Sequence, residues 1–586
     1  MTRLYRFFIG VFCPVLFGIC GAGLLRQQMV VAANTTSATY VVNQTFDAVD
    51  ANTVDGICDA DINTPGGQCT LRAAIQQANA HAGPDTVVLT GNLTYALNIT
   101  GTLEDDAIRG DLDINDDLLI SIGSVEPSLS GLTAVTSISN QVKGRAVLDG
   151  RQIDRVLHIV HGQTEISGVV IYNGNVGDAG GGLLDEDKLI MTNSLVMSSS
   201  ADTGGGIYVY GGRLQLKDTD VLSNRAQSLG GGLYNDPGST IEMNGGRIAY
   251  NAIESAAGYG AGLANTNIAG LYQVVVSDNW ISSTQIAIGG GLLNFNSGTL
   301  SLELSRVERN WITGTLPNSG NGGGLHNASN SHMIIISTTL AENQSIYGGG
   351  LQNDGLMTIT ASSIYSNAAI EIAGGIANIG ADDPAAQLMI VNSTIGANRS
   401  QGSAGGIHND GRMSIFNATV ANNVADADQD GRGDVGGLST GTRLSGTVET
   451  FVANSVIALN IDASPVLTSF VIAPDCGGML IAQGINLVQN TTGCKLTGAL
   501  GRVITNTNPR LGPLQDNSGP TWSYQPMFAS PLINSGAMDG CRDAANTMLN
   551  VDQRGLQRPR DGRCDLGALE TVNLVTAMLY MPTLWR

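Results

Sequence analysis

Charged and aromatic residues are scarce in this chain, and the charge it carries is one-sided. Only 13% of the 586 residues are charged and 5% are aromatic, and 29 Lys and Arg stand against 50 Asp and Glu, which gives a formal net charge of −21. Nucleic-acid binding needs clustered Lys and Arg to neutralise phosphates, so this balance excludes nucleic acid as a partner. An acidic, sparsely charged surface is instead usual for secreted proteins and can attract divalent cations.

Cysteine is absent from the middle of the chain. Two of the eight cysteines fall in an apolar N-terminal segment, and the other six lie towards the two ends. An even number in an exported chain predicts disulfides, and proximity in the sequence favours three pairs while leaving other connectivities open. These pairs are Cys58–Cys69, Cys476–Cys494 and Cys541–Cys564. Zinc is the alternative, but there is no Cys-x-x-Cys pair and no nearby His to complete a site.

The N-terminus has the features of an export signal. Arg3 and Arg6 precede an apolar run of 19 residues from Phe7 to Leu25, and the small residues Ala32 and Ala33 follow. This order predicts a signal peptide over residues 1–33 and a secreted or cell-surface protein. A run of this length is also compatible with an uncleaved membrane anchor.

A short glycine-rich phrase is repeated through the middle of the chain. It reads Gly289-Gly290-Gly291-Leu292-Leu293-Asn294, with close copies at Gly230, Gly322 and Gly348 and looser ones at Gly180, Gly204, Gly260, Ala373, Ala404 and Val435. The mean period is about 28 residues, which indicates a solenoid. Within each period lies a second phrase, an apolar residue followed by two spacers and Asn, as in Val221 to Asn224.

The residues between these phrases favour short strands. Runs such as Leu300 to Leu304 alternate apolar and polar residues, and no helical periodicity is sustained. Each period therefore predicts one coil of a parallel β-helix, built from three short strands and their turns. The Asn at the end of the glycine phrase should stack from coil to coil, through Asn235, Asn265, Asn294, Asn327, Asn353, Asn378 and Asn409.

The two phrases together resemble the repeats of polymorphic outer-membrane proteins and related secreted β-helix proteins, over about residues 155–460. The resemblance implies an all-β fold, a right-handed parallel β-helix of the pectin-lyase-like kind, at a cell surface. It implies no particular reaction. We assign residues 85–464 to the β-helix.

The segment before the β-helix resembles another family. Cys69 to Ala80 is similar to the CSLREX-type domain that precedes β-helices in bacterial secreted proteins, with Thr70 and Ala73 in place of that motif's Ser and Glu. Thr70 is a suitable N-cap, and the residues after it form one apolar helical face. Residues 34–84 are therefore expected to cap the first coil, with Arg72 in a salt bridge or carbonyl contacts.

The segment after the β-helix has its own resemblance. Asn550 to Gly555 and Cys564 to Glu570 are similar to the choice-of-anchor Q domain of bacterial surface proteins, which implies attachment to the cell envelope or sorting. We expect residues 465–570 to form this C-terminal module and residues 571–586 a tail. The charged residues Asp552, Arg554, Asp565 and Glu570 are expected to form a network that closes the last coil.

Aromatic residues gather where three consecutive coils are longest, in expected loops at 252–259, 280–288 and 311–321. Trp280 and Trp311 each follow the Asn of the second phrase. Adjacent coils lie about 4.8 Å apart, so the two indoles could stack and, with Tyr259, form a platform for a glycan or a surface protein. The alternative is that these rings only cover a corner of the coil.

One acidic loop matches part of a calcium-binding pattern. Asp426, Asp428, Asp430 and Asp434 occupy positions 1, 3, 5 and 9 of a loop with Gly at position 6. The bidentate Glu expected at position 12 is absent, so the sequence predicts weak Ca²⁺ binding or a solvated acidic turn. No other cofactor is expected.

The sequence assigns no catalytic residue. The acidic residues of the repeats do not converge on a pair with a base, and there is no Gly-x-Ser-x-Gly motif. We therefore expect a secreted or surface-attached β-helical protein that binds or displays, with adhesion to glycan or matrix as its use. A polysaccharide lyase or glycoside hydrolase, and a structural surface-layer protein, are the alternatives.

Overall fold

The computed structural model describes residues 36–102, 104–123, 142–314, 320–380, 386–441, 448–465, 471–538, 540–560 and 562–571. The predicted signal peptide and the tail beyond Thr571 lie outside these ranges. Within them, none of the helices combines the length and apolar character needed to cross a membrane.

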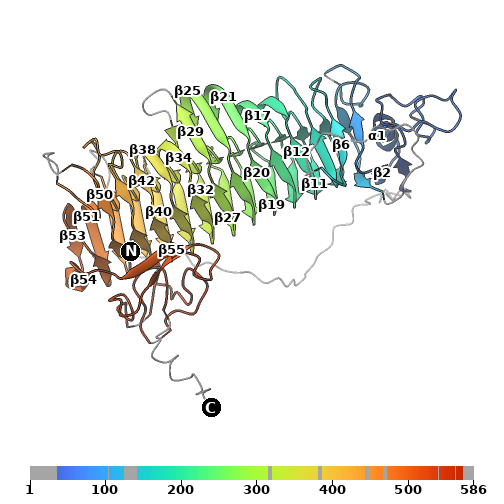
Figure 1. The fold of residues 1–586 in the computed structure, drawn as a ribbon. Helices are drawn as coiled ribbons and strands as arrows, with labels where there is room; N and C mark the ends of the chain where they lie inside the picture. The colour runs from blue at the N-terminus through green and yellow to red at the C-terminus, as the bar shows by residue number, and fades with distance from the viewer. Residues whose placement is uncertain are drawn as a thin grey trace, which may run out of the picture.

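The described chain winds into one long solenoid of parallel strands, which runs across Figure 1 from the blue N-terminal end to the orange C-terminal end. Three sheets run along it: two extend over nearly the whole solenoid, and the third is formed by the coils from β13 to β50. The expected fold class, an all-β parallel β-helix with a small cap helix and a disulfide-containing C-terminal part, is confirmed.

The first sheet has two rows of strands. The long-strand row is formed mostly by five-residue strands: β1 (Thr39–Val41), β2 (Asp85–Leu89), β5 (Leu118–Ile122), β8 (Gln163–Ser167), β11 (Lys188–Thr192), β15 (Arg213–Lys217), β19 (Thr240–Asn244), β23 (Ile268–Tyr272), β27 (Thr299–Glu303), β32 (His332–Ile336), β36 (Leu356–Thr360), β40 (Gln387–Val391), β44 (Arg412–Phe416), β48 (Glu449–Ala453), β51 (Cys476–Gln483) and β53 (Cys494–Gly498). The short-strand row is formed by three-residue strands: β4 (Leu112–Ile114), β7 (Leu157–Ile159), β10 (Leu183–Asp185), β14 (Ile207–Val209), β18 (Leu233–Asn235), β22 (Leu263–Asn265), β26 (Leu292–Asn294), β31 (Leu325–Asn327), β35 (Leu351–Asn353), β39 (Ile376–Asn378), β43 (Ile407–Asn409) and β47 (Leu438–Thr440). The glycine phrase thus leads into a strand of its own, so a coil such as 207–229 has four strand segments where the sequence suggested three.

The second and third sheets complete each coil. The second sheet contains β3 (Thr94–Ala96), β6 (Ala146–Asp149), β9 (Val169–Tyr172), β12 (Leu195–Met197), β16 (Asp220–Leu222), β20 (Arg247–Ala249), β24 (Val275–Ser277), β28 (Arg306–Glu308), β33 (Thr339–Ala341), β37 (Ser363–Tyr365), β41 (Thr394–Gly396), β45 (Thr419–Ala421), β49 (Val456–Ala458), β52 (Asn486–Val488) and β54 (Val503–Ile504). The third sheet contains β13 (Ser200–Thr203), β17 (Arg225–Leu229), β21 (Ala252–Tyr259), β25 (Trp280–Ile288), β29 (Trp311–Gly314), β30 (Gly320–Asn321), β34 (Gln344–Tyr347), β38 (Ala368–Ile372), β42 (Arg399–Ser400), β46 (Val424–Ala425) and β50 (Ile461–Asp462).

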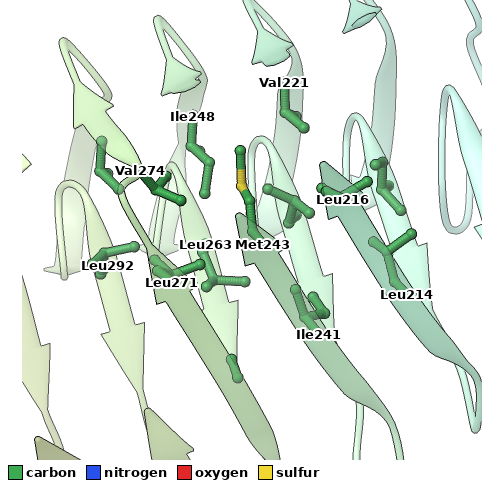
Figure 2. Packing of buried hydrophobic residues seen from close by; sticks show 14 of the residues in the cluster. Leu214, Leu216, Val221, Ile241, Met243, Ile248, Leu263, Leu271, Val274 and Leu292 are labelled. Carbon is green, nitrogen blue, oxygen red and sulfur yellow. The ribbon is translucent and has the colours of Figure 1, made fainter. Parts of the chain in front are cut away.

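The core is a column of apolar side chains stacked in register. Leu214 pairs with Ile241 and Leu216 with Met243 across β15 and β19, and all four are buried. Figure 2 shows these residues and their equivalents pointing into the space between the sheets. Because successive residues of a strand face opposite sides, the alternating runs place every second residue in this column. Burial of apolar area at about 25 cal/mol per Å² is the main stabilising term here.

Two ladders of buried Asn run along the solenoid. The predicted ladder is present, with side-chain amides of neighbouring coils 2.6–2.9 Å apart from Asn235 to Asn409. The Asn of the second phrase forms another, in which Asn310 donates to the Asn343 side chain at 3.0 Å and receives the Asn279 amide at 2.9 Å. These contacts satisfy amides that are fully buried.

The second Asn ladder explains why the two phrases occur together. A Cβ on the third glycine of the phrase, such as Gly291, would lie 2.9 Å from the side chain of Asn310 and 2.6 Å from a carbonyl oxygen of the next coil. The Asn therefore occupies the space that only glycine leaves free.

A short helix covers the N-terminal end of the solenoid. Helix α1 (Leu71–Ala80) begins after Thr70, whose side chain accepts a hydrogen bond from the Ala73 amide, as the sequence predicts. The helix contacts β1, β2 and β4. Arg72 is fully buried, forms an ion pair with Asp47 at 2.7 Å and donates to three carbonyl groups, so it has the structural role expected for it.

The parallel sheets do not end at residue 464, where the sequence repeat ends. Strands β51 to β54 continue all but the third sheet as far as Ile504, although Cys476 to Ile504 carries no glycine phrase. Strand β51 pairs with both β47 and β48, so it continues both rows of the first sheet beyond the last glycine phrase.

The C-terminal module lies against the side of the solenoid and not over its last coil, which corrects the expectation that it closes that coil. After β55 (Leu511–Gln515) and β56 (Ser523–Pro526), an antiparallel pair, the chain packs on the second sheet. Tyr524 contacts Ala421, and the Ala568 amide donates to Thr419 at 3.1 Å. Figure 1 shows this segment beneath the yellow and orange coils.

The expected charged network forms inside the module. Arg554 pairs with Asp552 at 2.7 Å, and the buried Arg558 pairs with Glu570 at 2.9 Å. Asp565 accepts hydrogen bonds from Asn534 and Thr571. The network therefore fixes the fold of the module where it docks on the coils.

The three disulfides join the cysteines that are nearest in the sequence. They are Cys58–Cys69 beside helix α1, Cys476–Cys494 in the last coils, and Cys541–Cys564 in the C-terminal module. Each closes a loop of 11 to 23 residues outside the regular glycine-phrase coils.

Candidate functional site

The longest coils extend the third sheet into a projecting surface, which we call the wing. It consists of β21, β25, β29 and β30, seen at the upper edge of the solenoid in Figure 1. The sequence suggested loops here, but the residues of β21 and β25 pair along nearly their whole length, with one register shift near Ser255. The extra residues 252–259 and 280–288 are therefore ordered as strands, whereas residues 315–319 of the third expected loop lie outside the described residues.

A small apolar cluster of its own holds the wing together. Ile253, Ile281 and Ile312 are in register, are buried and pack with three alanines, Ala226, Ala261 and Ala287. This cluster could have been found in the sequence, because each isoleucine stands two residues after the Asn of the second phrase.

The same alternation places two tryptophans on the outer face of the wing. Trp280 and Trp311 each precede one of the buried isoleucines, so their side chains point to the opposite side of the sheet. Their rings are 5.1 Å apart with an angle of 3° between the planes, and both remain partly exposed. The expected stacking of the indoles is present, and we call this pair the tryptophan platform.

Polar and small side chains surround the tryptophan platform. Ala252 and Gln344 flank the indoles in the same row of the sheet, and Ser282 and Thr313 occupy the next outward positions. An ion pair between Arg225 of β17 and Glu254 of β21, at 3.0 Å, joins the two coils that precede Trp280. The arrangement offers apolar ring surface beside hydrogen-bonding groups.

Tyr259 does not belong to the tryptophan platform, contrary to expectation. It lies at the far end of β21, in register with Ile288, whereas Trp280 is in register with Ala252 at the start of the strand. Seven residues separate the two positions, which corresponds to roughly 20 Å in an extended strand. A loop would have allowed the two ends to approach, but the strand keeps them apart.

The acidic loop brings together three of its four predicted ligands. Carboxylate oxygens of Asp426, Asp428 and Asp430 lie within 4.8 Å of one another, with Asp426 buried and the other two exposed. Asp426 also accepts a hydrogen bond from the Gly431 amide at 3.1 Å. Asp434 is not part of this group, because the chain has already returned to the sheet there and its carbonyl pairs with Ala404.

A groove crosses the outer face of the long-strand row. It has a volume of about 480 Å³ and lies over Gly270, where the row lacks a side chain. Lys217, Glu242, Tyr272 and Glu303 line it. Sequence reasoning missed this groove, although the glycine at an outward strand position, among polar neighbours, is the signal for it.

The groove does not contain a close pair of carboxylates. Glu242 and Glu303 come from strands two coils apart, which puts their backbones roughly 10 Å apart at about 4.8 Å per coil. Glu242 is also engaged by Arg213 at 2.9 Å. Burial raises the pKa of Asp111 to about 6 and that of Asp185 to about 8, but neither residue lines the groove. The described residues thus offer no clear acid–base pair in this groove.

No protein-family model and no curated protein matches this chain. Among solved structures, the chain is similar to the pectate lyase Pel9A. The two are 12% identical over 92% of this chain and 97% of the lyase chain, with a TM-score of 0.30. The Dettilon tailspike protein gp208 is 12% identical over 79% of this chain and 69% of that one, with a TM-score of 0.27. At these values neither likeness bears on activity, and the resemblances to the CSLREX-type, repeat and choice-of-anchor families stay predictions. The strand pairing itself defines the chain as a parallel β-helix protein.

Proposed function

We propose that this protein is exported and binds extracellular glycan, or a surface protein that carries it, through the tryptophan platform. The observation that carries the proposal is the pair of parallel, stacked and partly exposed indoles on the outer face of the wing. The apolar face of a sugar ring packs well on such a surface, while Ser282, Thr313 and Gln344 supply hydrogen bonds to its hydroxyl groups. The three disulfides support an extracellular location.

The wing favours binding over simple corner filling. Its interior is already closed by the isoleucine cluster, so the indoles are not needed to cover the core. Each indole lies on a strand that is paired on both sides, so the two rings are held parallel. Binding of a ligand therefore does not require a loop to become ordered.

The test is a glycan array with the purified protein and the variants Trp280→Ala and Trp311→Ala. Either change should reduce binding to the preferred glycan at least tenfold, because removal of one ring leaves half of the platform. Tyr210→Ala is the matched control, since Tyr210 is exposed and stacks on Tyr208 elsewhere on the solenoid. Equal binding by all four proteins would contradict the proposal.

A reducing-end release assay on every glycan that binds separates adhesion from catalysis. Release of product that is lost in Glu242→Gln would favour the enzymatic alternative, a lyase or hydrolase acting in the groove. Absence of both binding and release would favour a structural surface-layer role.

We further propose that Asp426, Asp428 and Asp430 bind Ca²⁺ weakly and stiffen their loop. Three carboxylates within 4.8 Å supply the oxygen ligands that Ca²⁺ prefers. In isothermal titration calorimetry with CaCl₂, Asp430→Asn should weaken binding several-fold. Asp434→Asn should leave it unchanged because Asp434 lies outside the group; equal loss in both variants would contradict the assignment.

The C-terminal module is proposed to attach the protein to the cell envelope. Its resemblance to the choice-of-anchor Q domain supports this, and its docking on the side of the solenoid leaves the wing uncovered. Cell fractionation of the native host with and without residues 505–586 tests it: the truncated chain should appear in the medium.

A further inference from the structure

A second group of polar residues lies at the opposite end of the solenoid from the C-terminal module. Asp113 in β4 and His158 in β7 are directly in register in the short-strand row, and Glu186 follows β10 in the next coil. Asp105 approaches them from the segment that precedes β4. Four residues from three consecutive coils and their entry segment therefore meet at one point, although 81 positions separate the first from the last.

The imidazole of His158 has a carboxylate on each side. Its Nδ1 lies 3.2 Å from Asp113 Oδ1 and 3.8 Å from Asp105 Oδ1, and its Nε2 lies 3.7 Å from Glu186 Oε1. Asp113 is fully buried and His158 is 8% exposed. Three carboxylates thus surround one largely buried imidazole; of these, Asp113 is buried and Asp105 is exposed.

On the Nδ1 side, His158 is within hydrogen-bond distance of Asp113, and a second carboxylate, that of Asp105, lies just beyond hydrogen-bond distance of the same nitrogen. The ligand atoms of His158, Asp113 and Asp105 all lie within 4.8 Å of one another. Around an ion with bonds of about 2.1 Å, tetrahedral ligands are separated by about 3.4 Å. The observed distances of 3.2 and 3.8 Å bracket that value, whereas a hydrogen bond at 3.8 Å would be too long.

The Nε2 side supplies an independent observation. Nε2 of His158 is buried and has no hydrogen-bond partner, although Glu186 stands 3.7 Å away. A buried polar nitrogen without a partner costs free energy. If Nδ1 is bound to an ion, Nε2 carries the proton and faces a carboxylate, which is the usual arrangement behind a metal-bound histidine.

The surroundings hold the ligands in place. The second oxygen of Asp113 accepts the Ala107 amide at 2.9 Å, which leaves Oδ1 for His158 or an ion. The Ala107 carbonyl in turn accepts hydrogen bonds from Arg72 and Gln76 of helix α1, so the cap helix fixes this segment. Such supporting contacts orient ligands before an ion binds.

The site is also accessible. Asp105 lines a cavity of about 680 Å³ between helix α1 and the first coils, together with Gln76, Asn79, Asn115 and His161. A small ion can reach the Asp105 carboxylate from this cavity.

From this geometry we infer that His158, Asp113 and Asp105 form a binding site for a divalent transition-metal ion, with Glu186 as the carboxylate behind the histidine. One imidazole with two carboxylates suits Zn²⁺, whereas Ca²⁺ prefers oxygen ligands alone. The bound ion joins the first coils to the segment held by the cap helix.

Isothermal titration calorimetry of the full protein with ZnCl₂, after treatment with a chelator, tests the site. One high-affinity equivalent is expected, and both His158→Gln and Asp105→Asn should weaken it at least tenfold. Asp105→Asn is the safer variant for folding because its side chain is 71% exposed. Titration with CoCl₂ should give a visible absorption band that His158→Gln removes.

His326→Gln is the matched control. His326 occupies the same row further along the solenoid, is equally buried and lies 3.3 Å from Asp354, but it lacks a second carboxylate on its other nitrogen among the described ion pairs. It should bind Zn²⁺ as the unaltered protein does. Absence of Zn²⁺ binding would overturn the inference, because His158 would then be only an ion-paired histidine. Unchanged affinity in either His158→Gln or Asp105→Asn would also overturn it, because the bound metal would then be an adventitious ion only.

Discussion

At the scale of single residues, Asp185 is a carboxylic acid at a position that faces the apolar core. It points into the solenoid in register with Val209 and Ile159, is fully buried, and neither carboxylate oxygen forms a hydrogen bond of normal geometry. Burial raises its pKa to about 8. Two coils further along, the same position is taken by Asn235, the first member of the Asn ladder.

The raised pKa of Asp185 predicts a pH-dependent stability. In the unfolded chain this carboxyl ionises near pH 4, but in the folded protein it stays protonated until about pH 8. The stability gained from the neutral form is therefore complete below about pH 4 and is lost as the pH rises through 8. Asp185→Asn should match the unaltered protein in melting temperature at pH 4 and melt several degrees higher at pH 8.

The control for this prediction is Glu303→Gln, which neutralises an exposed carboxylate of the same solenoid. Its melting temperature should follow that of the unaltered protein at both pH values. A difference between Asp185→Asn and the unaltered protein that does not grow with pH would count against the assignment.

At the scale of the structural element, the Asn ladders hold neighbouring coils in register. Asn310 is fully buried, donates to Asn343 and to the Val276 carbonyl, and accepts from both the backbone and the side chain of Asn279. Asn310→Ala removes these bonds and leaves buried partners unsatisfied, which should cost about 2–4 kcal/mol. Thermal unfolding and hydrogen exchange measure the effect, and the loss of protection should be centred on coils 275–345. Asn244→Ala, at the exposed end of β19, should change little.

How much of the fold the sequence predicts differs from element to element. The period, the inward rows and the ladder from Asn235 follow from spacing alone, because a solenoid repeats the same local environment in every coil. The wing does not follow, since the register shift near Ser255 interrupts the alternation that marks a strand. For the candidate site, the stacking of Trp280 on Trp311 was predictable from the register, whereas the position of Tyr259 depended on the wing being a sheet.

The cluster around His158 was out of reach of sequence reasoning for another reason. The first coils lack the glycine phrase, so nothing in the sequence fixes which residue of the segment 104–123 pairs with His158. The acidic run near Asp113 is visible, but its alignment with the histidine comes from the parallel pairing of β4 with β7.

At the scale of the whole molecule, one buried arginine links the interior of the C-terminal module to the solenoid. Arg558 is fully enclosed; it pairs with Glu570 and also donates to Asn392 of the solenoid at 2.7 Å, 166 residues away. Arg558→Ala leaves the Glu570 carboxyl without its cation and should cost about 3–5 kcal/mol. Limited proteolysis should then cut the module while the coils stay resistant.

Arg510→Ala is the control, because Arg510 belongs to the same segment but is exposed. It should leave the proteolysis pattern unchanged. Cleavage that spreads through the coils at the same rate as through the module would show that the two parts unfold together.

The side-on position of the module has a mechanical consequence. Thr571 emerges from a body that hydrogen-bonds to β41 and β45 through Gln553 and Ala568 and packs on the second sheet as far as Leu487 of β52. A pull applied at that point enters the rod sideways, across several coils at once, so the rungs are loaded in shear. The end coil shares this load with the coils before it and is not peeled away from the stack alone.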